Sequence, residues 1–230
     1  MNTLRGLSFV VLFALTALPL LAGPIPPIDA TPGSSFVVSF DGRGFTPASP
    51  TVPVLIPSLT ANSRFSNFVF TDDFANNRTR VTFTTEINFN GSAPLTGGQV
   101  HSIGFNTTPT IQAGGNTVSG AFDTVNIHQA LPGPTNVEFC FADTTDCAGN
   151  LGGTGVALGS VGTAYASLYF GGTGLRTLTF DNMYIRYMNL SGIPGVYNGL
   201  GSPVPEAAHY IVLSAGLALV GLRRRFFGRA

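Results

Sequence analysis

Hydrophobic and polar residues alternate along much of this chain with a period of two. The clearest run is RTRVTFTTEINFN, residues 78–90. Its odd-numbered positions from 81 to 89 are apolar or threonine, and its even-numbered positions from 80 to 88 are polar. A period of two is typical of a strand with one face in a core and the other in water. Residues 78–90 are therefore predicted to form a half-buried strand.

Shorter alternating runs recur through the body of the chain and predict further strands. They cover residues 34–40, 64–72, 98–106, 117–128, 135–143, 161–170 and 175–188. Turn-forming clusters such as DGRG and QAGGN separate them, and no stretch of the body shows a sustained helical period. The pattern predicts an all-β fold, a single antiparallel β-sandwich with a jelly-roll-like arrangement. A closed barrel is the alternative that the pattern alone does not separate from it.

Composition narrows the class of protein that this body can be. Charged residues make up 10% of the 230 residues, against about 25% in an average soluble domain. Residues 23–203 contain six arginines and ten acidic residues, a net charge of −4. Nucleic-acid binding relies on clustered basic side chains that neutralise phosphates, and the body has no such cluster. We therefore expect a β-rich extracellular domain with no nucleic-acid partner.

The first 22 residues have the layout of a secretory signal peptide. Arg5 supplies the positive end, residues 7–21 form an apolar stretch, and small residues follow at Ala22 and Gly23. We expect cleavage after Ala22, because a cut after Gly23 would leave Pro24 at the new N-terminus. An N-terminal membrane anchor is the alternative, but the stretch is short for a span, which needs about 20 residues. Export would place the body outside the cytoplasm.

The chain has two cysteines, Cys140 and Cys147, in the stretch FCFADTTDCAGN. The residues between them are mostly polar or small, which is typical of a surface loop that follows a strand. In an oxidising compartment we expect the two thiols to form a disulfide that closes this loop. A metal site is the alternative, but it would need further cysteine or histidine ligands at suitable spacing.

The rest of the body offers few candidates for catalysis. His101 and His128 lie in alternating runs and are predicted to be strand residues. No G-x-S-x-G elbow is present. The glycine-rich stretch 149–162 lacks the Lys-Ser or Lys-Thr ending of a phosphate-binding loop, since the chain contains no lysine. We expect no nucleophile and no phosphate site.

Two pairs of acidic residues are the remaining candidates for chemistry. Asp72 and Asp73 are adjacent, and Asp143 and Asp146 share the cysteine loop. Paired carboxylates hydrolyse glycosides when they flank the sugar at a set separation, and loop carboxylates can bind calcium. The chain has no D-x-D-x-D-G loop, so calcium stays an alternative. We expect solvated turn residues, no catalytic residue, no resident cofactor and no metal site.

The end of the chain joins an apolar span to a cluster of arginines. Residues 207–222 contain no charged side chain and would form a helix about 24 Å long at about 1.5 Å per residue. Arg223, Arg224 and Arg225 follow directly and are expected to stay on the cytoplasmic side of a membrane. A buried core helix is the alternative, but three consecutive arginines argue against it. We predict a transmembrane helix at 207–222.

The order of these pieces resembles the PEP-CTERM sorting signal of exported bacterial proteins. Val204, Pro205 and Glu206 match the first three residues of the family's Val-Pro-Glu-Pro motif, and Ala207 stands where the motif has its second proline. The apolar span and the arginine cluster match the rest of the signal. The resemblance implies that an exosortase, a membrane-embedded enzyme similar to a cysteine transpeptidase, recognises the motif and processes the tail.

The resemblance covers the tail and the signal peptide and implies nothing about the fold of the body. It implies a Gram-negative host, a precursor held transiently in the inner membrane, and a mature protein at the cell surface or in the biofilm matrix. We divide the chain into a signal peptide (1–22), an extracellular β-sandwich (23–203) and a sorting tail (204–230).

The expected function is that of a non-enzymatic exported surface or matrix protein. A carbohydrate-binding module for exopolysaccharide, acting through exposed tyrosine or phenylalanine, is the first alternative. A glycan hydrolase is the weaker one, because no acid pair or nucleophile stands out from the sequence.

Overall fold

The computed structural model describes residues 25–46, 49–56, 58–130, 136–143, 147 and 155–204. These residues form antiparallel strands joined by turns, with a single 3₁₀ turn (η1, Phe74–Asn76), so the predicted all-β class is confirmed. The predicted signal peptide and the predicted transmembrane helix at 207–222 lie outside the described residues. Within the described ranges, no helix is long and apolar enough to cross a membrane.

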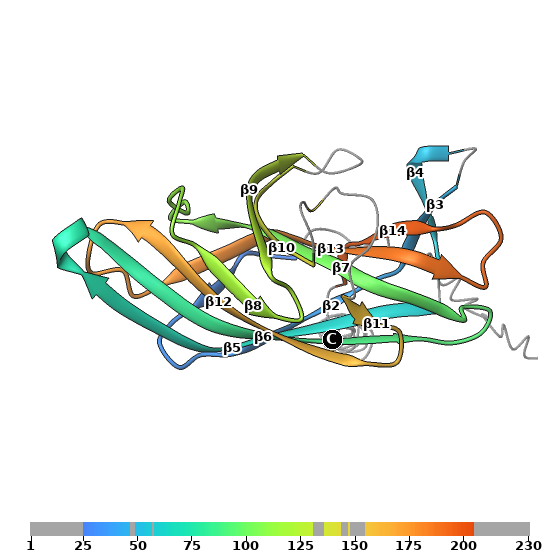
Figure 1. Ribbon diagram of the computed structural model, residues 1–230, viewed down its shortest axis with the longest axis horizontal. Helices are drawn as coiled ribbons and strands as arrows, with labels where there is room; N and C mark the ends of the chain where they lie inside the picture. The colour runs from blue at the N-terminus through green and yellow to red at the C-terminus, as the bar shows by residue number, and fades with distance from the viewer. Residues whose placement is uncertain are drawn as a thin grey trace, which may run out of the picture.

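The strands form two sheets that pack face to face, as in a β-sandwich (Figure 1). In spatial order, the larger sheet contains β4 (Ser49–Leu55), β3 (Arg43–Thr46), β14 (Asn198–Gly201), β13 (Leu178–Ser191), β7 (Gly97–Thr108), β10 (Asn136–Ala142) and β9 (Thr124–Ala130). In addition, β1 (Ile28–Ala30) pairs with β13, and β11 (Val156–Ala157) pairs with β7. The smaller sheet contains β15 (Pro203–Val204), β2 (Phe36–Phe40), β5 (Leu59–Asp73), β6 (Arg78–Gly91), β12 (Val161–Gly171) and β8 (Thr117–Gly120).

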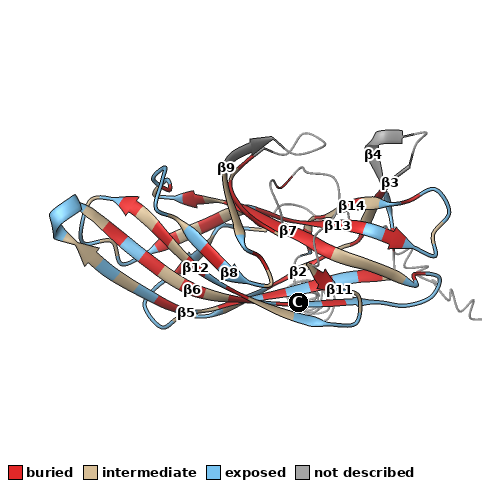
Figure 2. Cartoon of the chain, viewed as in Figure 1, coloured by how far each residue is buried: buried red, intermediate tan, exposed pale blue. Residues whose placement is uncertain are grey.

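Strand β6 is the run in which the alternation is clearest. Its odd-numbered positions from 81 to 89 are all buried, and its even-numbered positions from 80 to 88 are exposed or half-buried. Figure 2 shows the resulting bands along β5 and β6, which pair with each other. The predicted half-buried strand at 78–90 is therefore confirmed, with its apolar face in the core.

The core between the sheets is a cluster of phenylalanine rings. The ring centre of Phe180 lies 5.7 Å from that of Phe65, 5.8 Å from Phe83 and 5.0 Å from Phe105. Phe65 and Phe83 belong to the smaller sheet, whereas Phe105 and Phe180 belong to the larger one. These are the distances at which aromatic pairs attract each other beyond simple burial, so the rings join the two sheets.

Strand β7 differs from β6 because both of its faces are covered. The six residues from Val100 to Phe105 are all buried, and Figure 2 shows this strand as an almost continuous buried band. The inner face packs in the phenylalanine core, and a second cluster lies on the outer face of the larger sheet. That outer cluster contains Val137, Cys140, Ala142, Cys147 and Tyr184.

A change of register interrupts the pairing of β7 with β13. Val100 pairs with Tyr187 and Ser102 pairs with Arg186, so β7 has one more residue than β13 at this point, His101. His101 is a buried strand residue, as the sequence predicts. His128 lies in β9, also a strand.

Candidate functional site

The chain leaves the body through a short crossing from one sheet to the other. Strand β14 ends at Gly201 in the larger sheet and β15 begins at Pro203 in the smaller sheet, so only Ser202 lies between them. Val204 stands opposite Ser39 of β2. Val204 is the first residue of the predicted sorting motif, so that motif begins inside the last described strand.

Asp41 holds this crossing through both its backbone and its side chain. Its backbone N–H donates to the carbonyl of Ser202 over 2.9 Å, and its Oδ1 accepts from the N–H of Ser202 over 2.7 Å. Its Oδ2 forms an ion pair with Nε of Arg43 at 2.8 Å. Its carbonyl accepts from the hydroxyl of Tyr187 over 2.9 Å. We name Asp41, Arg43, Tyr187 and Ser202 the exit clasp.

Gly201 and Pro203 suit this crossing, because glycine has no side chain and proline has no backbone N–H. A Cβ atom at Gly201 would lie 2.6 Å from the carbonyl oxygen of Asp41, so a side chain there would prevent this close approach. Bonded and non-bonded pairs alternate along an antiparallel ladder; Asp41 donates its backbone N–H to the carbonyl of Ser202, and its side chain takes the N–H of Ser202. The next pair, Pro203 with Phe40, needs no donor, which suits a residue without an N–H.

A surface hollow of about 430 Å³ lies beside the exit clasp. Its lining includes Val204, which is 38% exposed, and Asp41. Most of the remaining lining is apolar, with Leu55, Ile56 and Leu59 contributing. The start of the predicted motif is therefore held against the body and still reachable from solvent.

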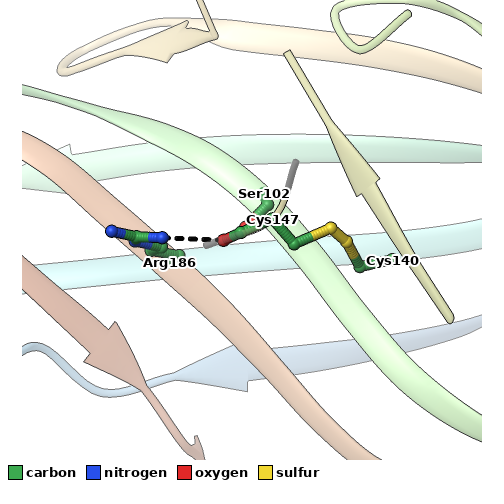
Figure 3. The surroundings of a disulfide bond; sticks show 4 residues. All are labelled: Ser102, Cys140, Cys147 and Arg186. Atoms are coloured by element: carbon green, nitrogen blue, oxygen red, sulfur yellow. Dashed lines mark hydrogen bonds between the residues drawn. A yellow bond between two sulfur atoms is a disulfide. The ribbon is translucent and has the colours of Figure 1, made fainter. Parts of the chain in front are cut away.

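A disulfide joins Cys140 of β10 to Cys147, with their Cα atoms 6.4 Å apart (Figure 3). Both cysteines are fully buried on the outer face of the larger sheet. The carbonyl of Cys147 accepts from Nη1 of Arg186 over 2.8 Å and from Oγ of Ser102 over 3.4 Å. Because Arg186 is only 4% exposed, the disulfide places an acceptor where a buried guanidinium requires one.

Tyr184 lies across β7 beside this disulfide. Gly104 pairs with Cys140 on one side and with Tyr184 on the other, and a Cβ atom at Gly104 would overlap the ring of Tyr184. Burial raises the pKa of the Tyr184 hydroxyl above its usual value, so this group stays protonated at neutral pH. The cluster is built for packing around the disulfide.

The acidic pair at the end of β5 is engaged in ion pairs. Asp72 accepts from Nη2 of Arg176 over 2.7 Å and from the hydroxyl of Thr79 over 3.0 Å. Asp73 accepts from Nε of Arg78 over 2.8 Å. Hydrogen bonds from Arg176 and from Arg78 hold the pKa values of Asp72 and Asp73, respectively, below their usual range. Carboxylates with a lowered pKa are ionised at neutral pH and are therefore poor general acids there.

The second acidic pair is only partly within the described residues. The carboxylate of Asp143 accepts from the N–H of Gly155, and burial raises the pKa of this carboxyl. Asp146 lies outside the described residues, as do Pro205, Glu206, Arg223, Arg224 and Arg225. Among the residues that are described, no three histidine, cysteine, aspartate or glutamate side chains lie close enough together to hold a metal ion.

The outer face of the smaller sheet carries an exposed aromatic ring among hydroxyl-bearing residues. Tyr165 of β12 is 58% exposed and stands opposite Thr84 of β6 on one side and Ser119 of β8 on the other. Four residues further along the same strand, the guanidinium of Arg78 lies 3.9 Å from the ring centre of Tyr169. An exposed ring with hydroxyl groups beside it can stack on a sugar and hydrogen-bond to it.

Sequence reasoning missed the exit clasp, and the sorting motif, of which the structure describes only Val204, stays a prediction. It assigned DGRG, residues 41–44, to a turn, and nothing in those four residues indicates a partner at Ser202. One sequence feature could have indicated the crossing: Gly201 and Pro203 are separated by a single residue at the end of the body. Both residues break a strand pattern, which indicates a crossing without naming its partner.

Comparisons of this chain with models of protein families, with curated proteins and with solved structures gave no match. What the chain does must therefore be inferred from its own residues.

Proposed function

We propose that this chain is a non-enzymatic exported surface or matrix protein whose tail is processed by an exosortase-type enzyme. In this proposal residues 1–22 are removed on export and residues 207–222 hold the precursor transiently in the inner membrane. The enzyme recognises Val204, Pro205 and Glu206. The observation that carries the proposal is the order of motif, apolar span and arginines in the tail.

Two structural features support export and a non-enzymatic body. The disulfide between Cys140 and Cys147 is of a kind that persists mainly in oxidising compartments outside the cytoplasm. One of the two acid pairs that a glycan hydrolase could use is committed to structural contacts, since Asp72 and Asp73 each form an ion pair.

Mass spectrometry of the protein recovered from its host tests this proposal. We expect a mature protein that has lost residues 1–22 and the part of the tail beyond the processing site. Glu206→Ala should accumulate as a longer, membrane-bound precursor, because it alters the centre of the motif. Glu86→Ala, an exposed glutamate on β6, is the matched control and should mature normally. Recovery of a protein with both Met1 and Ala230 intact would refute the proposal.

A carbohydrate-binding module for exopolysaccharide is the second candidate, and the exposed ring of Tyr165 favours it. A sugar can stack on such a ring only if one face of the ring is accessible, and Tyr165 is 58% exposed. We expect Tyr165→Ala to abolish binding of the protein on a glycan array while leaving the fold intact. Val161→Ala is the control and should leave binding unchanged, because Val161 is equally exposed on the same strand, at 58%, but has no aromatic ring. Absence of glycan binding by the unchanged protein removes this candidate.

We also propose that the sandwich has a jelly-roll-like arrangement of strands and is flanked by a helix on each side. A jelly-roll-like arrangement is supported by the repeated passage of the chain between the sheets from β6 to β9, whereas β2, β5 and β6 are neighbours within one sheet. The signal helix at 1–22 and the transmembrane helix at 207–222 are proposed from sequence.

A further inference from the structure

The distance between the body and the proposed membrane span is very short while β15 is paired. Val204 is paired with β2, and the apolar span begins at Ala207, so only Pro205 and Glu206 separate them. Three fully extended residue steps reach at most about 11 Å. An enzyme that binds an extended peptide through its main chain needs residues on both sides of the reacting bond. The folded body and the membrane together leave little room for that.

Release of β15 would remove this restriction. The chain would then be held at Gly201, which pairs with Ile185 in the larger sheet. Six residue steps separate Gly201 from Ala207, with a reach of at most about 22 Å. Detachment of β15 therefore doubles the length of free chain around the motif and frees the main-chain edge of Val204 that is paired with β2.

The exit clasp holds the chain directly before β15. This strand makes only two residue pairs, and Pro203 occupies the non-bonded one, so Val204 is its one residue at a bonded position of the ladder. Asp41 adds two hydrogen bonds to Ser202, the residue directly before β15, once with its backbone N–H and once with a carboxylate oxygen. Hydrogen bonds to a charged acceptor are stronger than neutral ones. The Asp41 carboxylate is largely shielded, with 12% of its side-chain surface exposed.

We propose that Asp41 is a positioning residue that controls processing of the tail. While the exit clasp is closed, Val204 is held against β2 and withheld from the processing enzyme. Opening of β15 presents the motif. This inference rests on the proposed function, because it requires that the motif be recognised by a processing enzyme.

A redox-controlled crosslink tests this inference without altering the motif. In the full-length chain, Asp41→Cys and Ser202→Cys are combined, because the two residues share a backbone hydrogen bond next to the Pro203–Phe40 pair. Opposed residues of antiparallel chains have Cα atoms about 4.5–5.5 Å apart, within the range for a disulfide. The oxidised variant has the crossing covalently closed, and the reduced variant lacks the Asp41 carboxylate. In cells that contain the processing enzyme, we expect the oxidised form to remain as precursor and the reduced form to be processed. The unchanged protein, treated with the same reductant, controls for Cys140 and Cys147.

Single substitutions give an independent readout. We expect Asp41→Ala to be processed about tenfold faster than the unchanged protein, since a hydrogen bond to a charged group shifts the open population by about that factor. Asp41→Asn, which keeps an acceptor for the Ser202 N–H, should fall between them. Asp29→Ala is the matched control, because Asp29 accepts from the hydroxyl of Thr179 at 2.6 Å and holds β1, a different short strand. It should leave the processing rate unchanged.

The outcomes separate this inference from the proposed function. If the unchanged protein is not processed, or if Glu206→Ala is processed normally, the proposed function fails. If processing depends on Glu206 but proceeds equally in the oxidised and reduced double variant, the role of Asp41 is overturned. Faster processing of the oxidised form would overturn it as well, because a closed clasp would then present the motif.

Discussion

Asp72 and Arg176 show how single charged residues are used in this body. Their side chains lie 2.7 Å apart, although the residues are 104 positions apart in the chain. Asp72 also accepts from the backbone N–H of Gly174 over 2.8 Å, so it fastens the β12–β13 connection to the end of β5. Asp73, at the end of β5, accepts from Arg78, at the start of β6, and so closes the turn between these two strands. Charges are few in this chain, and these are placed where they hold connections.

Replacement of Asp72 by asparagine tests this role through the pH dependence of stability. The pKa of Asp72 is lower in the folded protein than the unfolded value of about 3.9. Ionised Asp72 therefore stabilises the fold above about pH 4, and this contribution is lost as the pH falls towards the folded pKa. We expect Asp72→Asn to have a lower free energy of unfolding than the unchanged protein at pH 7. The difference should shrink below about pH 4, because protonation removes the same charge.

Urea titrations of both proteins between pH 7 and acid pH measure this difference. A gap between the two unfolding midpoints that stays constant down to acid pH would show that the charge of Asp72 does not matter to the fold.

The burial of β6 can be predicted from its own sequence, whereas the burial of β7 cannot. Strand β6 has one buried face and one exposed face, and its alternation is regular. Strand β7 is buried on both faces over six residues, and Gly104 leaves space there for the ring of Tyr184. A glycine inside a strand pattern often marks such a close approach. The reason for a glycine at position 104 becomes clear only from the pairing of β7 with β13, which carries Tyr184.

Gly104→Ala tests that close approach. The added methyl group would overlap the ring of Tyr184, and overpacking of this kind costs about 1–3 kcal/mol. Gly171→Ala is the control, since the nearest atom to its new Cβ would be Nε2 of the flexible Gln112 side chain, at 3.2 Å. Thermal and urea unfolding of both variants should show a marked loss of stability for Gly104→Ala alone. Equal stability of the two variants would mean that Tyr184 moves away freely.

The sequence was sufficient for elements whose burial follows from local alternation. It predicted the strand at 78–90 with the correct buried face, and it predicted strands at the other alternating runs. It did not predict the outer cluster, because Cys140 and Tyr184 meet only when β10 and β13 flank β7. The exit clasp was missed for the same reason, since Asp41 and Ser202 are 161 positions apart. Their contact depends on the topology, which local patterns do not encode.

On the scale of the whole molecule, the phenylalanine core makes the two sheets one cooperative unit. Phe180 of β13 contacts rings from β2 and β5 as well as from β7, with centroid distances of 5.4 Å to Phe36, 5.8 Å to Phe68 and 5.0 Å to Phe105. Phe180 is fully buried. Loss of its ring would remove contacts on both layers at once.

Phe180→Ala should therefore destabilise the entire body. Large-to-small replacement of a buried phenylalanine costs about 3–5 kcal/mol, a large part of the stability of a typical domain. We expect the urea midpoint to fall strongly in a single transition, because both sheets lose the same partner. Phe74→Ala, which removes a ring that is 79% exposed, should leave the midpoint unchanged. Two separate transitions in the Phe180 variant would show that the sheets unfold independently.

The position of β15 at the end of the body also has a mechanical consequence. A chain that is fixed by its C-terminal end transmits tension first to β15, at the edge of the smaller sheet. Two residue pairs and the bonds of Asp41 resist this pull before the load reaches Gly201 and β14. Tension would therefore first detach β15 and extend the few residues at the exit. The aromatic core would bear no load until these residues are fully extended.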